Sequence, residues 1–278
     1  MRFSIWSHIP EHINPVAFCI GPLEIRWYGM MYVVAFFIVY YLVLYRLEKE
    51  KFEFTKKVIN NFIFWVVLGV LIGGRLGYVL FYGLKYFIAN PFRIISPFDF
   101  SRGFHYTGIY GMSYHGGLCG AAFACVIFCR RNKINFWRLA DLFIPAVPLG
   151  YAFGRLGNFI NGELYGRVTN VSWGMYFPLD LTRQLRHPSQ LYEAFFEGIF
   201  LFIILWSLRK VKYFDGFIFS LYLVGYGVLR FFIEFFREPD PQLGFILGPF
   251  TMGQIFCFSM VAAGILIFLF KKRRNSIA

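Results

Sequence analysis

The composition of this 278-residue chain argues against a soluble globule: 58% of its residues are hydrophobic and only 15% are charged, against about 25% charged in ordinary soluble domains. The formal net charge of +13 could indicate a nucleic-acid binder. The basic residues lie in clusters between apolar runs, however, where they are better explained as signals of membrane orientation, and we expect no nucleic-acid partner.

In chain order, seven apolar stretches are candidates for membrane helices, which need about 20 mostly apolar residues. They cover residues 28–45, 58–80, 113–129, 139–157, 193–208, 216–234 and 251–270. Residues 1–27 lack the pattern of a signal peptide and are predicted to form an uncleaved outer arm, while 81–112 and 158–192 are predicted to form a small outer cap. The predicted fold is an all-α integral membrane protein, with a single polytopic domain over 1–278.

Basic clusters alternate with these stretches. They lie within residues 46–57, 130–138, 209–212 and 271–274. Because cytoplasmic loops carry an excess of Lys and Arg, seven crossings place all four clusters on the cytoplasmic side, with the N-terminus outside and the C-terminus cytoplasmic.

Five cysteines show no paired metal-ligand spacing, which argues against both a zinc site and a disulfide framework. The sequence therefore predicts no metal and no cofactor.

The motif GRLGNFINGELYG, at 154–166, puts polar side chains where the fourth stretch is predicted to reach the outer leaflet. They are Arg155, Asn158, Asn161 and Glu163. Two prolines interrupt the preceding stretch, so a lipid-facing helix is not expected here. One interpretation is an interfacial turn whose arginine snorkels to the headgroups. The other is an anion site in which Arg155 presents forked donors to a phosphate, the asparagines add neutral donors, and Glu163 holds an arginine in position.

A second GRLG, at 74–77, ends the second stretch. Here Gly69, Gly73 and Gly77 have the small-xxx-small spacing of closely packed membrane helices. Arg75 in this motif is compatible both with snorkelling and with lipid binding.

The sixth stretch contains YGVLRFFIEFFR, in which four polar residues share one helical face. They are Tyr226, Arg230, Glu234 and Arg237, spaced four, four and three residues apart. An Arg–Glu pair can be purely structural, but charges near the end of a membrane helix favour a functional site.

MSYHGGL, at 112–118, places His115 near the outer start of the third stretch. This histidine is a candidate proton acceptor, with a hydrogen-bonded structural imidazole as the alternative. Cys119, one turn later, raises the idea of a Cys–His nucleophile. That idea is disfavoured because apolar burial raises the pKa of a thiol and no third group nearby would orient the pair.

Two further stretches, RWYGMMY at 26–32 and RHPSQLYE at 186–193, add polar outer surface. Tyr28 and His187 suit interfacial anchors, and Ser189 with Gln190 suits a helix cap.

Together these motifs resemble the bacterial phosphatidylglycerol:prolipoprotein diacylglyceryl transferase family. The resemblance rests on RWYGMMY, GGRLGYVLFY, MSYHGGL, GRLGNFINGELYG, RHPSQLYE and YGVLRFFIEFFREPD, which run in order from about residue 26 to 240. It implies transfer of the diacylglyceryl group of phosphatidylglycerol to the lipobox cysteine of a preprolipoprotein signal peptide, with formation of a thioether and release of glycerol 1-phosphate. It also implies a location in the bacterial inner membrane among membrane lipids, with the active site near the outer leaflet.

The resemblance further implies roles for a set of polar residues. They are Tyr28, His115, Arg155, Asn158, Glu163, Tyr226, Arg230 and Glu234. We expect His115 to act as the base, Arg155 with Asn158 to bind the lipid phosphate, and Arg230, held by Glu234, to bind the same group or the departing glycerol phosphate. Asn161 and Arg75 complete the predicted substrate-binding set.

A transporter or channel is the main alternative, because broken membrane helices with inward Arg and Glu also line substrate pathways. A structural membrane scaffold is a third class. The sequence shows no paired inverted halves, which transporters often have, apart from the repeated tetrapeptide GRLG.

Overall fold

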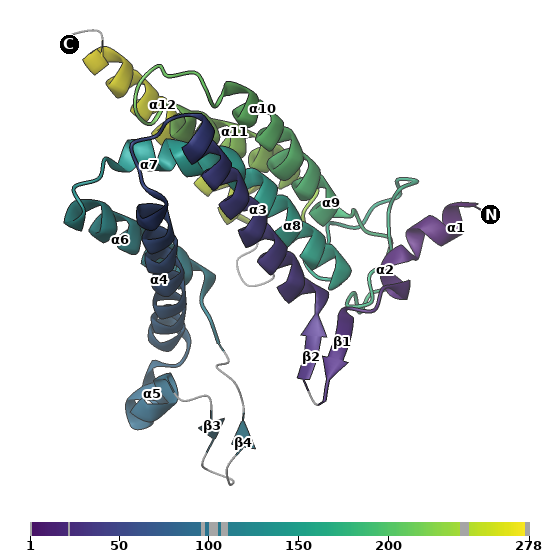
Figure 1. The fold of residues 1–278 in the computed structure, drawn as a ribbon. Helices are drawn as coiled ribbons and strands as arrows, with labels where there is room; N and C mark the ends of the chain where they lie inside the picture. Colours follow the sequence, from purple (N-terminus) through teal and green to yellow (C-terminus); the bar gives the residue numbers. More distant parts are fainter. Residues whose placement is uncertain are drawn as a thin grey trace. The chain divides into compact units, whose positions relative to one another are not determined.

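The computed structural model describes residues 2–21, 23–95, 98–99, 105–106, 111–239 and 245–275. These residues are mostly helical, as predicted, with three short two-stranded antiparallel sheets added (Figure 1). They divide into two compact units, one of residues 1–52 with 137–278 and the other of residues 53–136. A single polytopic domain stays a prediction.

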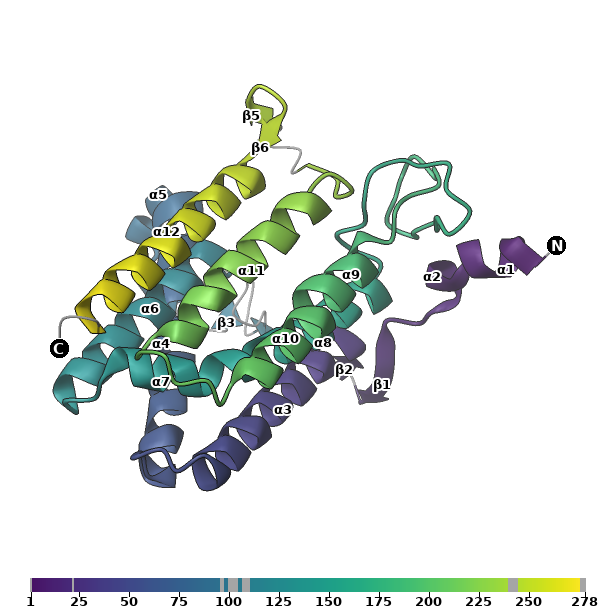
Figure 2. The ribbon, with the colours of Figure 1, turned by 90° about the horizontal axis from the view of Figure 1, so that it is seen from above.

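The first unit contains most of the long helices. Its helices are α1 (Arg2–Ser7), α2 (Ile9–His12), α3 (Trp27–Lys49), α7 (Phe136–Phe143), η2 (Ile144–Ala146), α8 (Val147–Ile160), α9 (Ser189–Tyr192), η3 (Glu193–Phe200), α10 (Leu201–Leu208), α11 (Phe217–Ile233) and α12 (Met252–Asn275). Figure 2 shows α8 between α3 and the α9–η3–α10 helix, and α11 beside α12. The element α8 therefore contacts helices on both sides.

The predicted stretch 139–157 folds as three consecutive pieces, α7, η2 and α8. The two prolines explain the break, because Pro145 lies at the start of η2 and Pro148 in the first turn of α8. A proline has no N–H to donate, so it is tolerated in the first turn of a helix and interrupts a longer one. The two prolines therefore mark where η2 and α8 begin.

The predicted stretch 193–208 begins earlier, at Ser189, and its middle is widened. Residues Glu193–Phe200 form η3, a π-helix with i→i+5 hydrogen bonds. Such segments are rare and occur frequently at functional sites.

The basic clusters of the first unit meet at one end of its helices. Arg46, at the end of α3, is buried and pairs with Glu50 at 2.7 Å. Its Nη2 also donates to the carbonyl of Arg209, whose Nε lies 2.9 Å from Glu50. At the start of α7, Arg138 pairs with Asp215, and the neighbouring Trp137 stacks under Lys271 of α12. The clusters lie close together in space although they are far apart in sequence.

The N-terminal arm leads into α3 through a hairpin of β1 (Val16–Ile20) and β2 (Leu23–Arg26). Helix α1 contacts the loop 161–188: Trp6 Nε1 donates to Trp173 O at 3.2 Å, and Tyr176 N donates to Ser7 O at 2.7 Å. The segment predicted as an outer arm is thereby attached to the segment predicted as a cap.

An ion pair stabilises the fold of loop 161–188. The guanidinium of Arg186 contacts both carboxylate oxygens of Asp180, at 2.8 and 3.1 Å. Burial by itself would raise the pKa of Asp180, but the hydrogen bonds from Arg186 and Thr182 outweigh it and lower that pKa to about 2.

The second unit is built on α4 (Lys56–Tyr82) and α6 (Tyr114–Arg131), which pack along their glycines. A Cβ atom on Gly73 would lie 2.4 Å from the carbonyl oxygen of Gly116, and one on Gly69 would lie 2.6 Å from that of Gly120. The close packing predicted from the small-xxx-small spacing is confirmed, because no larger residue fits there.

The predicted cap segment 81–112 belongs to this second unit. Its described part contains α5 (Leu84–Ala89), η1 (Pro91–Ile94) and a hairpin of β3 (Phe98–Asp99) and β4 (His105–Tyr106). In the first unit, β5 (Phe245–Leu247) and β6 (Phe250–Thr251) form a third hairpin before α12.

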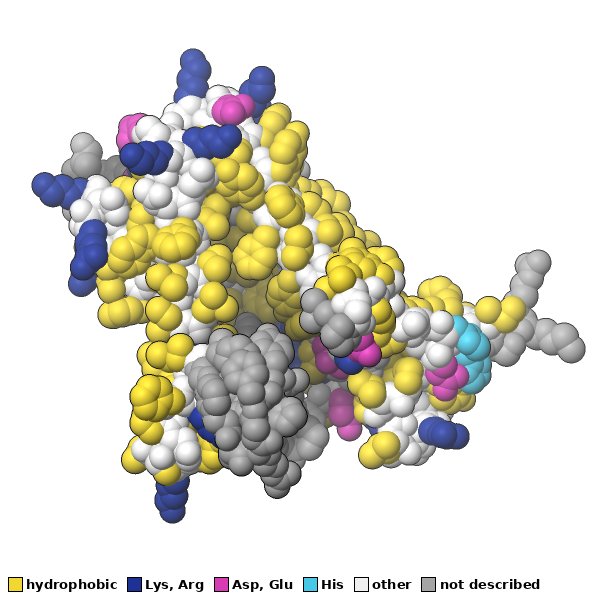
Figure 3. All heavy atoms as spheres, turned by 60° about the horizontal axis from the view of Figure 1, so that its bottom comes forward, with side chains coloured by type: hydrophobic (Ala, Val, Ile, Leu, Met, Phe, Trp, Pro, Cys, Tyr) yellow, Lys and Arg dark blue, Asp and Glu magenta, His cyan; other side chains and the backbone are white. Residues whose placement is uncertain are grey.

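All seven predicted stretches are helical, but fewer meet the length and hydropathy of a membrane span. Among the described residues, five spans do so: 27–49, 56–82, 136–160, 189–208 and 252–273. Helix α11 is a shorter apolar helix, and α6 is not among the five because its eighteen residues include a histidine near the start and two arginines at the end, which lower its hydropathy. Figure 3 shows hydrophobic side chains over much of the described surface, as expected for helices in contact with lipid.

Candidate functional site

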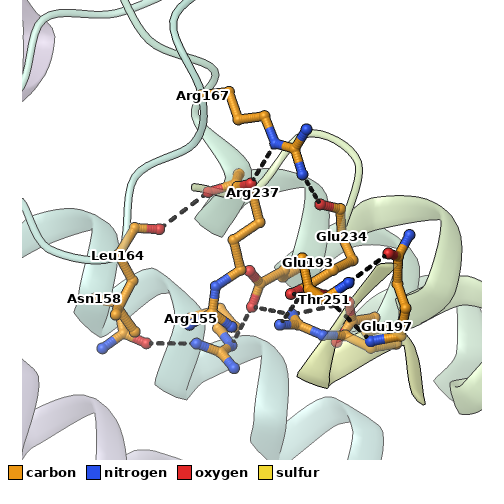
Figure 4. A network of polar contacts seen from close by, with 12 residues as sticks. Arg155, Asn158, Leu164, Arg167, Glu193, Glu197, Glu234, Arg237 and Thr251 are labelled. Atoms are coloured by element: carbon orange, nitrogen blue, oxygen red, sulfur yellow. Dashed lines mark hydrogen bonds and ion pairs between the residues drawn. The ribbon is translucent and has the colours of Figure 1, made fainter. Parts of the chain in front are cut away.

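The polar side chains of the first unit converge between α8, η3 and α11. The centre of the group is Glu193, which is fully buried on η3. Its Oε2 lies 2.6 Å from Nε of Arg155 on α8 and 3.2 Å from Nη1 of Arg230 on α11 (Figure 4). One carboxylate oxygen therefore bridges two arginines from different helices.

Two further carboxylates contact Arg230. Its Nη2 pairs with Glu234 Oε2 at 2.7 Å, one turn along α11, and its Nη1 lies 3.5 Å from Glu197 Oε1. Tyr151 of α8 donates to Oε2 of both Glu193 and Glu197, at 3.1 and 2.5 Å. We call Tyr151, Arg155, Glu193, Glu197, Arg230 and Glu234 the arginine–glutamate cluster.

Helical spacing explains why these residues meet. Each of three helices contributes a pair of residues four positions apart, and such a pair faces one side of its helix. The pairs are Tyr151 and Arg155 on α8, Glu193 and Glu197 on η3, and Arg230 on α11 with Glu234 at its C-cap. Gly198 allows the close approach of η3 to α8, since a Cβ there would lie 2.5 Å from Cβ of Ala152. The backbone thus brings charged groups together that would be costly to bury separately.

A second polar group lies beside the cluster. Asn158 accepts a hydrogen bond from Arg155 Nη1 at 3.3 Å and donates to Glu163 Oε1 at 2.8 Å. Glu163 is fixed through its backbone, whose carbonyl accepts from the buried Gln190 at 2.7 Å. The carboxylate that holds Arg155 is therefore Glu193, whereas Glu163, predicted to hold an arginine, accepts a hydrogen bond from Asn158.

The remaining predicted residues of the first unit lie around this group. Tyr28 of α3 packs against Gly157, donates to Tyr32 at 3.2 Å, and interacts with Asn158 and Glu163. Tyr226 packs edge-to-face on Tyr151, with ring centroids 5.8 Å apart. Asn161 forms the C-cap of α8 through its backbone.

The ends of the cluster are fixed by neighbouring segments. Thr251 donates to Glu234 Oε1 at 3.0 Å, and Gly253 leaves room for this carboxylate, because a Cβ there would lie 2.7 Å from Oε1. Arg167 of the loop 161–188 donates to the carbonyls of Arg237 and Glu234, at 2.8 and 3.4 Å (Figure 4). Arg167 thereby satisfies carbonyl groups at the C-terminal end of α11.

Three residues singled out in the sequence lie in the second unit. Arg75 donates to three backbone carbonyls, those of Arg93, Ile94 and Gly111, at 2.6, 2.7 and 3.2 Å. His115 and Cys119 are exposed in the first two turns of α6. Arg75 thus connects α4 to the described cap segments, and the roles predicted for all three residues stay predictions.

Sequence reasoning missed Tyr151, Glu193 and Glu197. The two glutamates carried a usable signal, since they are charges within an apolar stretch, the same feature that drew attention to Arg230 and Glu234. Tyr151 carried none, because tyrosines are frequent throughout this chain.

Arg155 is the member of the cluster that is best placed to contact an anionic group. Arg155 is the most accessible of its charged members, with a side chain 17% exposed, while Glu193 is fully buried behind it. Glu193 holds Nε and Asn158 contacts Nη1, and no contact to Nη2 is described. Among the described residues, no group of three His, Cys, Asp or Glu side chains is placed to hold a metal ion.

Comparison with known proteins identifies relatives over nearly the whole chain. A sequence model of the family described as prolipoprotein diacylglyceryl transferase matches residues 15–270. The phosphatidylglycerol–prolipoprotein diacylglyceryl transferase of Chlorobaculum tepidum is 57% identical over 97% of this chain and 93% of its own length. The proteins of the same name from Geobacter sulfurreducens and Campylobacter curvus are 45% and 44% identical, over 95% and 97% of this chain and 97% and 98% of their own lengths.

Proposed function

Because this chain belongs to the prolipoprotein diacylglyceryl transferase family, we propose that Arg155 and Arg230 of its arginine–glutamate cluster bind the phosphate of the lipid donor during transfer. The chain is a transferase of lipoprotein biosynthesis, which moves a diacylglyceryl group from phosphatidylglycerol to a prolipoprotein. The relatives give no support to a transporter or channel.

The reaction we propose is alkylation of sulfur. The thiolate of a lipobox cysteine attacks the glyceryl carbon next to the phosphate, a carbon–sulfur bond forms, and the carbon–oxygen bond breaks with its electron pair on oxygen. The thiol proton passes to a base, and glycerol 1-phosphate leaves. Negative charge grows on the leaving oxygen in the transition state, so fixed cationic donors around the phosphate lower the barrier.

The observation that carries this proposal is the fixed pair of arginines. Arg155 is held by Glu193 and stacks on the Tyr151 ring, with the guanidinium carbon 4.7 Å from the ring centroid. Arg230 is held by Glu234. Because both guanidinium groups are held before the substrate arrives, little reorganisation is needed when charge develops. We assign Arg155 and Asn158 to the lipid phosphate, and Arg230 to the same group or the departing glycerol phosphate.

We assign supporting roles to the neighbouring polar residues. Tyr28 and Glu163 orient Asn158, Tyr226 orients Tyr151, and Asn161 and Arg75 belong to the lipid-binding surface. His115 is the proposed base for the lipobox thiol, since a neutral imidazole can accept a proton near neutral pH. Cys119 has no part in this mechanism, because the nucleophile is the cysteine of the substrate.

We also propose an inner-membrane protein with seven crossings, the N-terminus outside and the C-terminus cytoplasmic. The meeting of Arg46, Arg209, Arg138 and Lys271 around the same helix ends supports this orientation, since basic residues gather on the cytoplasmic side. Arg155 lies in the half of α8 away from those ends, so the active site would lie toward the outer leaflet. Lipid tails and a signal peptide would both enter sideways from the bilayer.

The experiment that tests the function combines purified protein, phosphatidylglycerol and a lipobox peptide, and weighs the peptide by mass spectrometry. The peptide should gain the mass of one diacylglyceryl group, and a matched peptide with serine in place of the lipobox cysteine should not. Equal modification of the serine peptide would refute sulfur alkylation.

A further inference from the structure

Three buried polar atoms at the centre of the arginine–glutamate cluster have no hydrogen-bond partner. They are Nη1 of Arg230, Oε1 of Glu193 and Oε1 of Glu197. Nη1 is within ion-pair range of Glu193 Oε2 and Glu197 Oε1, at 3.2 and 3.5 Å, but makes no hydrogen bond. Leaving such atoms unbonded is unfavourable, so a group of them points to a ligand that bonds them.

The types of these atoms restrict what that ligand can be. The guanidinium nitrogen is a donor, whereas the two carboxylate oxygens are acceptors. A phosphate offers acceptors only and would face the two carboxylates unfavourably. An ammonium offers donors only and would lie beside the charge of Arg230. A hydroxyl group both donates and accepts, so it fits both kinds of atom.

We propose that Glu197 and Glu193, together with Arg230 Nη1, recognise the hydroxyls of the glycerol headgroup and so select phosphatidylglycerol among phospholipids. This inference rests on the proposed function, in which the arginines bind the adjoining phosphate. The two subsites adjoin in the structure, because Oε2 of Glu193 contacts Arg155 while its Oε1 is one of the unbonded acceptors. One headgroup can therefore reach both.

Glu197 is the residue that decides the selection. Glu193 also holds Arg155, so changing it disturbs the phosphate subsite as well. The described contacts of Glu197 are with Tyr151, which holds Oε2, and with Arg230. Its Oε1 lies 3.5 Å from Arg230 Nη1 and makes no hydrogen bond, so it can accept one from the ligand.

The variant Glu197→Gln tests this assignment with little change of shape. The Tyr151 hydroxyl should keep the amide oxygen in the position of Oε2, which puts the amide NH₂ where Oε1 was. A donor then faces Arg230 Nη1 and the headgroup hydroxyl loses its acceptor. Glu24→Gln is the control, because Glu24 is half-exposed and pairs only with Arg26 at 3.2 Å among the described contacts.

The assay compares phosphatidylglycerol with phosphatidylpropanol, which has the same charge and a headgroup of similar size without hydroxyls. We would measure kcat/KM for transfer to a lipobox peptide from each lipid. The parent and Glu24→Gln should favour phosphatidylglycerol at least about tenfold, since a site built to bond a hydroxyl rejects an analogue without it. Glu197→Gln should lose this preference through a slower reaction with phosphatidylglycerol, while the phosphatidylpropanol rate is kept.

Each other outcome refutes the inference. Equal rates of the parent with both lipids would exclude headgroup recognition by these atoms while leaving the proposed function intact, and this comparison needs no variant. If Glu197→Gln is folded, as judged by its thermal unfolding, and its kcat/KM falls by the same factor with both lipids, then Glu197 is a purely structural residue. Absence of transfer from either lipid by the parent would overturn the proposed function, and the inference with it.

Discussion

Replacing Arg155 by lysine tests whether its guanidinium bonds the phosphate through two parallel donors or whether the side chain supplies only a positive charge. In the structure the Arg155 guanidinium makes three contacts at once: with Glu193 at 2.6 Å, with Asn158 at 3.3 Å, and with the ring of Tyr151. A lysine ammonium is a point charge on a flexible stem and cannot reproduce this planar geometry. We therefore expect Arg155→Lys to be nearly as inactive as Arg155→Ala.

The expected magnitude follows from the bonds that are lost. If the ammonium keeps the contact with Glu193, it loses at least one charge-assisted hydrogen bond to the phosphate, worth about 1.5–3 kcal/mol. At 1.36 kcal/mol per factor of ten, transfer should slow by roughly 10- to 150-fold. The loss should fall more on the chemical step than on lipid binding, because the leaving oxygen carries most charge in the transition state.

The assay is single-turnover transfer from phosphatidylglycerol to a lipobox peptide, with lipid binding measured separately on the same preparations. Arg26→Lys, a change at a half-exposed arginine, is the matched control and should behave as the parent. Thermal unfolding in detergent checks that the Arg155 variants are folded. Near-parental transfer by Arg155→Lys would show that the arginine supplies charge alone. The two-donor binding of the phosphate would then be assigned to Arg230.

Further predictions concern the base, the orientation and the stability of the fold. His115→Gln should slow transfer by about 10²–10⁴-fold and Cys119→Ala should stay active; a fully active His115→Gln would make the imidazole structural. A tag at the N-terminus should be external and one at the C-terminus cytoplasmic, whereas tags on the same side would require an even number of crossings. The ion pair that lowers the pKa of Asp180 to about 2 should stabilise the protein above the unfolded pKa near 4, and this stability should disappear as pH falls from about 4 to about 2. The parent should therefore unfold at a higher temperature than Asp180→Asn at pH 7, and a gap that persists unchanged at pH 3 would contradict this reasoning. Arg46→Met removes a fully buried charge partner and should cost about 3–5 kcal/mol in the free energy of unfolding, while Arg26→Met should cost little. Equal melting temperatures of these two variants would refute a stabilising role of the buried Arg46 ion pair.

The sequence by itself determined the class of fold and several members of the candidate site. Long apolar runs favour helices whatever their neighbours are, so all seven predicted stretches contain helix, and five spans of the described residues are long and apolar enough to cross a membrane. Spacing along one helix is also a local property, and the pairing of Arg230 with Glu234 and the close packing at Gly73 followed from it. The family was recognised for the same reason, since its motifs are continuous in the chain.

The partners of Arg155 were decided only by the tertiary structure. Glu163, eight residues away, was expected to hold an arginine, but the carboxylate that reaches Arg155 comes from η3, 38 positions along the chain. Which of several carboxylates meets a given arginine depends on how close two helices approach, and here Gly198 and the widened turn of η3 set that distance. Glu197 and Tyr151 join the site for the same physical reason: a charged or polar side chain buried in a membrane protein must find partners on neighbouring helices, and only packing specifies them.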